Sequence, residues 1–310
     1  MTDSSNPPKI GLALGSGASR GWSHIGVLKA LLAAGIEPDV VCGTSVGAMV
    51  GASYAAGNLD ALEEWVLGSN RSDVLSFFNF KLARTAFVDI ERLNWFLHKF
   101  VAAEEVQIND LGKTYAAVCT NLANGEEVWL TEGAVSDAVR ASMAMPGLFP
   151  AEHHGGRWLV DGGLVNPVPV STCRALGADI VIAVNLNSDI LTKRNTKPIA
   201  PVLSQESPHE DSFLESLRRQ TKEYSSSLFP SDDDEEKPPG LFSTIAMSIN
   251  IFQDQITRTR HKADPADIII SPKVGDIRML DFQRADAAIE EGSACAQAAV
   301  AEILRRAKMQ

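Results

Sequence analysis

The chain has 310 residues, of which 45% are hydrophobic and 22% are charged, enough apolar material for one large α/β core or two small ones. The 28 Lys and Arg residues stand against 39 Asp and Glu residues, which gives a net charge of −11. This charge argues against nucleic acid as a partner and against a strong general attraction to anionic membranes. A local membrane contact remains compatible with it.

The N-terminal part alternates between strand-like and helix-like segments. Residues 9–14 predict a buried strand, and residues 18–34 predict a helix that ends at Gly35, a favourable C-terminal glycine. Residues 39–42 predict a second strand. A helix follows that strand directly and runs to about Gly57.

The middle of the chain continues this alternation. Helices are predicted at residues 89–100 and 135–143, and Asn124-Gly125 is a hairpin signal between two strands. The predicted strands are residues 115–120, 126–130, 158–160 and 180–184.

Residues 188–240 break the α/β rhythm, and we interpret them as an irregular excursion with one helix at about 211–225. The last predicted elements are a helix at 241–260, a strand at 267–270 and an Ala-rich helix at 281–306. Because the alternation covers nearly the whole chain, we predict a flexible N-terminus at 1–8 and a single catalytic domain over 9–310.

The segment Gly43-Thr44-Ser45-Val46-Gly47 lies between the second strand and its helix. In this strand–turn–helix context Gly-x-Ser-x-Gly is typical of a nucleophile elbow. The turn is so tight that side chains two residues on either side of the serine would collide, so glycine is needed at both positions. The serine then lies at a helix N-terminus, where the dipole and free amides favour a developing negative oxygen.

A second glycine-rich turn, Gly15-Ser16-Gly17-Ala18-Ser19-Arg20-Gly21, follows the first strand. It fits either a dinucleotide fingerprint or an oxyanion hole made by the amides of Gly15, Ser16 and Gly17. A dinucleotide site expects an acidic residue at the end of the second strand, where this chain has Cys42, and that favours the oxyanion hole. Arg20 either holds the loop, contacts an anionic headgroup or is simply solvated.

An activated serine needs a base, and the six histidines do not supply an obvious one. None lies in a strand-end loop beside glycine or aspartate; they are His24, His98, His153, His154, His209 and His261. Asp161 ends a predicted strand and precedes Gly162 and Gly163, which let another backbone approach closely. It is either a plain turn former or the partner of Ser45, and the lack of another candidate favours the second interpretation.

Two further blocks, Ala141 to Pro150 and Asp161-Gly162-Gly163-Leu164-Val165-Asn166-Pro167, complete an ordered set of four with the two glycine turns. With these blocks the chain resembles the bacterial patatin-like phospholipases related to the neuropathy target esterase catalytic domain. The resemblance covers about residues 9–184, and more loosely the last strand and helix. It departs from the family at Ser16, where many members have a third glycine.

The resemblance implies a three-layer α/β/α fold with a mainly parallel central sheet and a nucleophile elbow. It also implies a Ser45–Asp161 dyad, with the first glycine loop as oxyanion hole. We expect Arg20 and the glycines Gly43, Gly47, Gly162 and Gly163 to support this site.

The predicted reaction is hydrolysis of a phospholipid, lysophospholipid or other lipid ester. A lipid ester would acylate Ser45 while Asp161 accepts the proton, and water would then release the fatty acid without a metal or organic cofactor. A free aspartate, with a pKa near 3.9, is a poor base, but burial would raise that pKa. Acyl transfer to another alcohol, and lipid binding without turnover, are the open alternatives.

Two apolar segments are candidates for a lid, for a shallow membrane-docking surface or for ordinary core. The first contains Val74, Leu75, Phe77, Phe78, Phe80 and Leu82, and the second contains Leu241, Ile245, Ile249, Phe252 and Ile256 on one predicted helix face. An exposed face of that helix would serve dimerisation equally well.

The first residues have neither the basic start nor the apolar centre of a secretory signal, and no apolar run approaches the ~20 residues that span a bilayer. The cysteines Cys42, Cys119, Cys173 and Cys295 lack paired spacing, so we interpret them as reduced thiols. We expect a cytoplasmic protein, with a peripheral membrane contact left open. The acidic run at 232–236 predicts a solvated loop, with a cation site as the weaker alternative.

Overall fold

The computed structural model describes residues 7–77, 88–189 and 241–309. Several expectations fall outside this part of the chain and stay predictions: the excursion at 190–240 with its helix and acidic run, the terminus at 1–6, Phe78, Phe80, Leu82 and His209. Within the described ranges, no helix has both the length and the apolar character needed to cross a membrane.

The described strands form one eight-stranded sheet in the order β5-β6-β3-β2-β1-β7-β8, with β4 paired to β3 off this path. The parallel strands are β1 (Ile10–Leu14), β2 (Val40–Thr44), β3 (Thr114–Asn121), β7 (Ile180–Val184) and β8 (Ile268–Ile270). The antiparallel strands are β4 (Glu127–Leu130), β5 (Glu152–His154) and β6 (Arg157–Asp161). The prediction of a mainly parallel central sheet is therefore confirmed.

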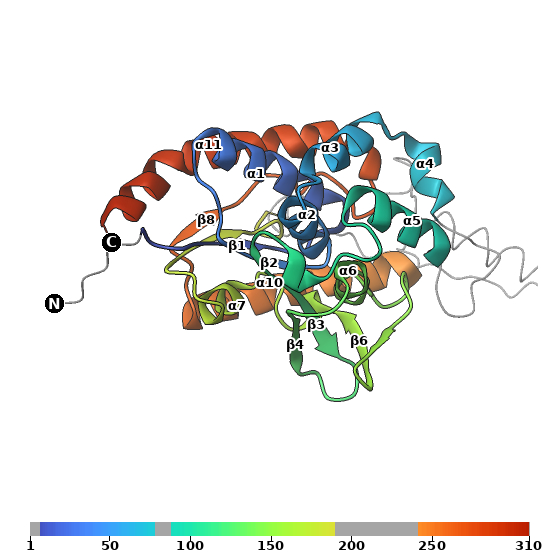
Figure 1. The fold of residues 1–310 in the computed structure, drawn as a ribbon. Coiled ribbons are helices and arrows are strands. Elements are labelled where there is room, and N and C mark those ends of the chain that lie inside the picture. The colour runs from blue at the N-terminus through green and yellow to red at the C-terminus, as the bar shows by residue number, and fades with distance from the viewer. Residues whose placement is uncertain (1–6, 78–87, 190–240, 310) are drawn as a thin grey trace, which may run out of the picture.

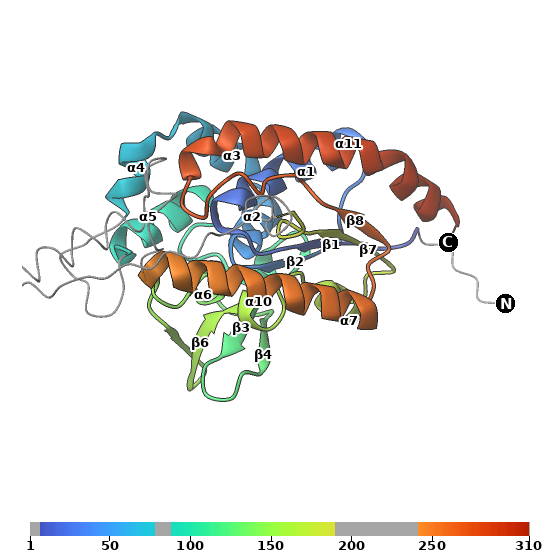
Figure 2. The same cartoon turned by 180° about the vertical axis from the view of Figure 1, so that it is seen from behind.

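Helices cover both faces of the sheet. Figures 1 and 2 show α1 and α11 on one side and α7 and α10 on the other, so the fold has three α/β/α layers, as predicted. This explains why β2 and β7 are buried along their whole length, as expected for strands covered on both faces. The helices are α1 (Ser23–Ala33), α2 (Val46–Ala55), α3 (Leu59–Gly68), α4 (Arg71–Ser76), α5 (Ile90–Phe100), α6 (Val135–Ser142), α7 (Val170–Ala175), α10 (Leu241–Ala263) and α11 (Ala285–Met309).

Several element boundaries differ from the prediction, and β5 and α7 were not predicted; two of the differences lie at the glycine turns. The first helix starts as a 3-10 turn (Ala18–Trp22) before α1, because Ala18 has a positive φ of 49° that an α-helix does not tolerate. The second strand extends past Cys42, because Gly43 pairs with Leu14 of β1 and Thr44 pairs with Val118 of β3.

Glycines allow α1 and α11 to pack backbone against backbone. A Cβ on Gly26 of α1 would overlap the carbonyl of Ile289, and one on Gly292 of α11 would overlap the carbonyl of Ser23. The two helices, which lie far apart in the sequence, run side by side in both views (Figures 1 and 2).

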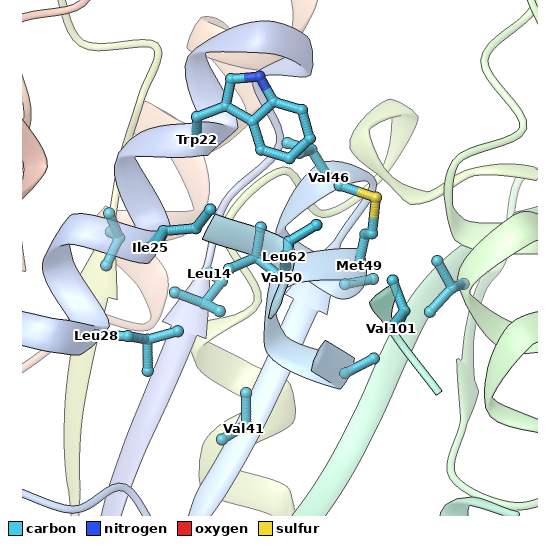
Figure 3. Packing of buried hydrophobic residues seen from close by; sticks show 14 of the residues in the cluster. Leu14, Trp22, Ile25, Leu28, Val41, Val46, Met49, Val50, Leu62 and Val101 are labelled. Carbon is cyan, nitrogen blue, oxygen red and sulfur yellow. The ribbon is translucent and has the colours of Figure 1, made fainter. Parts of the chain in front are cut away.

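The main core fills the space between the sheet and the helices α1, α2 and α3. Figure 3 shows side chains from these elements meeting around the end of β1. The labelled residues are Leu14, Trp22, Ile25, Leu28, Val41, Val46, Met49, Val50, Leu62 and Val101, each at most 3% exposed. This core holds β1, β2 and the N-terminus of α2, the elements that carry the two glycine turns, in one rigid arrangement.

Candidate active site

Ser45 follows β2 directly and has φ 58° and ψ −125°, a conformation that non-glycine residues rarely adopt. The flanking glycines explain how the turn closes. A Cβ on Gly43 would overlap the backbone of Ala48, and a Cβ on Gly47 would overlap the carbonyl oxygen of Leu14. The strained serine therefore lies at the N-terminus of α2, in the geometry of a nucleophile elbow.

Ser142 at the end of α6 supports the elbow. Its hydroxyl accepts a hydrogen bond from the Ser45 amide (2.9 Å) and donates one to the carbonyl of Val118 in β3 (2.6 Å). The side chain is fully buried. Sequence reasoning quoted this residue within a motif block but assigned it no role, and only its polar character in an apolar segment signals one.

The sheet register brings Ser45 and Asp161 together. Thr44 pairs with Val118 on β3, and the next residue of β3, Cys119, pairs with Asp161 at the end of β6. The Ser45 hydroxyl interacts with the Asp161 carboxylate, and this interaction lowers the pKa of Asp161. Residues 116 positions apart in the chain thus meet across a single strand.

The Asp161 carboxylate is 3% exposed, and its burial raises its pKa from 3.8 to about 6. The neighbouring Ser45 hydroxyl and a hydrogen bond from the Gly163 amide (2.7 Å) act in the opposite direction and offset part of this rise. A Cβ on Gly162 would overlap the carbonyl of Val118, so glycine is required for Asp161 to approach β3 this closely. The carboxylate ionises near neutral pH, where a general base is most effective.

The structure corrects the predicted set of oxyanion donors. The amide of Gly15 donates to the carbonyl of Val184 (3.1 Å), and the amide of Ser16 donates to the carbonyl of Pro167 (2.9 Å), so both are already engaged. The amides of Gly17 and Ala18 have no acceptor among the described residues. Of the three predicted donors only Gly17 keeps a free N–H group, and Ala18 is a further candidate.

Two buried side chains hold the loop. The Arg20 guanidinium donates to the carbonyl of Gly17 (3.0 Å) and to Asn250 (2.9 Å), and it is 3% exposed, so the interpretation of a solvated arginine is wrong. His24 hydrogen-bonds to the carbonyl of Gly15 (2.7 Å) through Nε2. Burial lowers the pKa of His24 to about 4, so its ring is neutral near pH 7 and donates from Nε2.

None of the five histidines among the described residues hydrogen-bonds to Ser45 or Asp161. His24 contacts the carbonyl of Gly15, and His98 Nδ1 lies 3.9 Å from the Glu104 carboxylate. His153 packs edge-on against Trp158. Within this part of the chain the histidines therefore lie apart from the serine, whereas Asp161 interacts with it.

Helix α10 contributes Asn250 and Gln253 to the wall of the site. Sequence reasoning did not identify these polar residues. Gln253 is 7% exposed and accepts a hydrogen bond from the Ser16 hydroxyl (3.0 Å), while Asn250 contacts Arg20. The prediction had assigned the apolar residues of this helix to one face. Along this face Ile249 is buried, whereas Phe252 is 60% exposed.

A pocket of about 980 Å³, including the part that opens to solvent, leads away from Ser45 and Asp161. Its walls are mostly apolar or aromatic: Trp22, Val46, Met49, Trp65, Phe77, Val88, Leu93, Phe96, Met143, Met145, Leu148, Phe149, Met279 and Phe282. Phe77, from the first predicted lid segment, packs edge-on against Trp65 and Phe96. The pocket suits an extended apolar chain.

The fold and the site define an α/β protein whose nucleophile elbow faces a buried carboxylate. The sequence profile of the Patatin-like phospholipase family matches residues 12–174, just over half of the chain. The chain belongs to the patatin-like phospholipase family and is, at the level of the family, a lipid hydrolase.

Relatives agree with this assignment. Uncharacterized NTE family proteins of Mycobacterium bovis and Mycobacterium tuberculosis are each 30% identical to the chain over 334 residues, covering 96% of the chain and 92% of the relative. Patatin-like phospholipase domain-containing protein 6 of Mus musculus is 34% identical over 194 residues, which cover 60% of the chain and 14% of that protein. Among solved structures, VipD from Legionella pneumophila matches with a TM-score of 0.49 and 16% identity, over 96% of this chain and 67% of that chain.

Proposed function

We propose that the protein is a serine lipid acyl hydrolase in which Ser45 is the nucleophile and Asp161 the general base. One observation carries the proposal: the sheet register brings the Ser45 hydroxyl, held in a strained elbow, beside a buried carboxylate whose pKa is raised to about 6. At neutral pH this carboxylate is ionised but more basic than an ordinary aspartate, so it is suited to accept the serine proton.

In the acylation step, the Ser45 oxygen attacks the ester carbonyl carbon as its proton passes to Asp161. The negative carbonyl oxygen of the tetrahedral intermediate is stabilised by the amides of Gly17 and Ala18 and by the N-terminal end of α2. Collapse breaks the bond to the leaving alcohol, which takes the proton from Asp161. The acyl group is then esterified to Ser45.

In the deacylation step, water attacks the acyl carbon and gives one proton to Asp161. The same amides stabilise the second tetrahedral intermediate. Its collapse releases the fatty acid and returns the proton to the Ser45 oxygen, which restores the free enzyme.

The pocket supports a lipid ester as the substrate class. Apolar and aromatic side chains line it beyond the dyad, so the acyl chain of a lipid ester occupies it and the alcohol part faces the entrance. Phospholipids, lysophospholipids and other lipid esters all meet this requirement. Contact with a membrane surface would be transient and would serve substrate uptake.

The test is the variant Ser45→Ala, with Ser248→Ala on the exposed side of α10 as the matched control. Both proteins are incubated with a mixed lipid extract, and released fatty acids are identified by mass spectrometry. A fluorophosphonate probe reports an activated serine independently. We expect hydrolysis and labelling in the wild type and the control, and neither in Ser45→Ala. Lipid binding without hydrolysis or labelling in the wild type would favour a lipid-binding regulatory protein instead.

A further inference from the structure

The side-chain amide of Gln253 is held in one orientation at the wall of the active site. Its Oε1 accepts hydrogen bonds from the Ser16 hydroxyl (3.0 Å) and from Asn187 Nδ2 (3.4 Å). Both contacts engage the oxygen, so the Nε2 amino group must face the other way. Ser16 is the position at which the chain departs from the glycine common in the family.

The Nε2 group of Gln253 lies beside Gly163 and the Asp161 carboxylate. A Cβ on Gly163 would overlap Nε2 and would also lie 2.9 Å from Asp161 Oδ1, so this glycine leaves the space between the amide and the carboxylate open. A carboxylate favours a neighbouring N–H group over a neighbouring carbonyl oxygen, which supports the same orientation. Nε2 donates to no acceptor among the described residues, and Gln253 lines the pocket.

We propose that Gln253 is a further catalytic residue, whose Nε2 donates a hydrogen bond to the oxygen that exchanges its proton with Asp161. This inference rests on the proposed hydrolase function. In acylation that oxygen belongs to the leaving alcohol, and in deacylation it belongs to the attacking water. Because one carboxylate serves both steps, both oxygens pass through the same position beside it.

The proposal divides the work between two sets of donors. The amides of Gly17 and Ala18 stabilise the carbonyl oxygen, whereas Gln253 stabilises the oxygen that leaves or attacks. Gln253 transfers no proton; Asp161 alone carries it. Ser16 and Asn187 act as positioning residues because they orient the amide without touching the reacting atoms.

This division has a kinetic consequence that a merely structural role lacks. An alkyl alcohol is a poor leaving group and needs stabilisation of its oxygen, whereas p-nitrophenolate leaves readily without it. Loss of the Nε2 donor should therefore slow acylation by an alkyl ester much more than acylation by a p-nitrophenyl ester of the same fatty acid. The value of kcat/KM reports acylation for both substrates.

The test variant is Gln253→Met, which keeps the side-chain size and removes both the Nε2 donor and the Oε1 acceptor of Ser16 and Asn187. The matched control is Gln255→Met at an exposed position of the same helix. For a monoacylglycerol we expect kcat/KM to fall by about 10- to 100-fold in Gln253→Met. For the p-nitrophenyl ester of the same acid we expect a fall of less than about threefold. Labelling by a fluorophosphonate, whose fluoride needs no proton, should persist and shows that the site is folded.

A second variant, Gln253→Glu, places another carboxylate beside Asp161. Like-charge repulsion should then move the acid limb of kcat/KM to higher pH than in the wild type. This measurement does not depend on the behaviour of Gln253→Met.

Equal losses with both esters, no loss with either, or an acid limb that does not move in Gln253→Glu would overturn the role of Gln253 while leaving the hydrolase proposal standing. A wild-type protein that neither reacts with the fluorophosphonate nor hydrolyses either ester would overturn the proposed function itself and this inference with it.

Discussion

Replacing Asp161 by asparagine should make the folded protein more stable while removing its activity. The carboxylate is buried, and its pKa is raised from 3.8 to about 6, so the folded state resists its ionisation. A difference of about two pKa units at 1.36 kcal/mol each corresponds to a cost of about 3 kcal/mol when Asp161 is ionised. Asparagine has nearly the same shape and no charge, so it avoids this cost.

The sign of the pH dependence follows from proton binding. Between pH 3.8 and about 6 the folded protein holds the Asp161 proton more tightly than the unfolded chain does. The contribution of this group to stability therefore decreases as the pH rises through that window, and the full cost applies above it. The stability advantage of Asp161→Asn should be about 3 kcal/mol at pH 8 and only about 1 kcal/mol at pH 4.5.

Urea unfolding of both proteins at the two pH values measures this difference, with Asp110→Asn on the surface as control. The same preparations report activity: wild-type kcat/KM should rise with pH through about 6 and then level off, whereas Asp161→Asn should be inactive throughout. An advantage that is equal at both pH values, or a variant less stable than wild type at pH 8, would refute the argument that burial raises the pKa of this carboxyl.

Three further substitutions test the elbow and the pocket. Gly47→Ala should destabilise the protein by about 3 kcal/mol, because the new Cβ overlaps the Leu14 carbonyl; an unchanged thermal midpoint would contradict this. Ser142→Ala leaves the Ser45 amide without its partner, so we expect a loss of about 1–3 kcal/mol in stability and a fall in kcat with little change in KM, measured by urea unfolding and steady-state kinetics. Phe96→Ala enlarges the pocket, so the preferred acyl chain in a series of p-nitrophenyl esters should lengthen; an unchanged preference would separate the pocket from acyl binding.

The fold was predictable because its signals are local. Glycine turns at strand–helix junctions and short buried apolar runs predicted the parallel strands and the elbow. The four ordered blocks predicted the family, and the family profile confirms it. The pairing of Ser45 with Asp161 rested on the lack of another candidate base and on the resemblance, because neither segment reveals the register across β3 that joins them.

The rest of the site depends on contacts between distant parts of the chain. The amides of Gly15 and Ser16 donate to the carbonyls of Val184 and Pro167, and no local sequence pattern reveals these partners. The expectation that the amides of Gly15, Ser16 and Gly17 are all free to bind an oxyanion was therefore wrong for two of the three. Gln253 lies 237 positions from the Ser16 hydroxyl that it accepts from. The sequence analysis of α10 considered only its apolar residues, so it did not identify Gln253 as a buried polar residue of the site.

The glycine contact between α1 and α11 bears on how the protein is made. Gly26 and Gly292 let the two backbones touch, so α11 packs directly on α1 in the same helical layer. During synthesis, the segment carrying both glycine turns emerges from the ribosome long before α11 exists to cover it. The face of α1 that packs against α11 therefore stays exposed on the nascent chain until α11 has been synthesised.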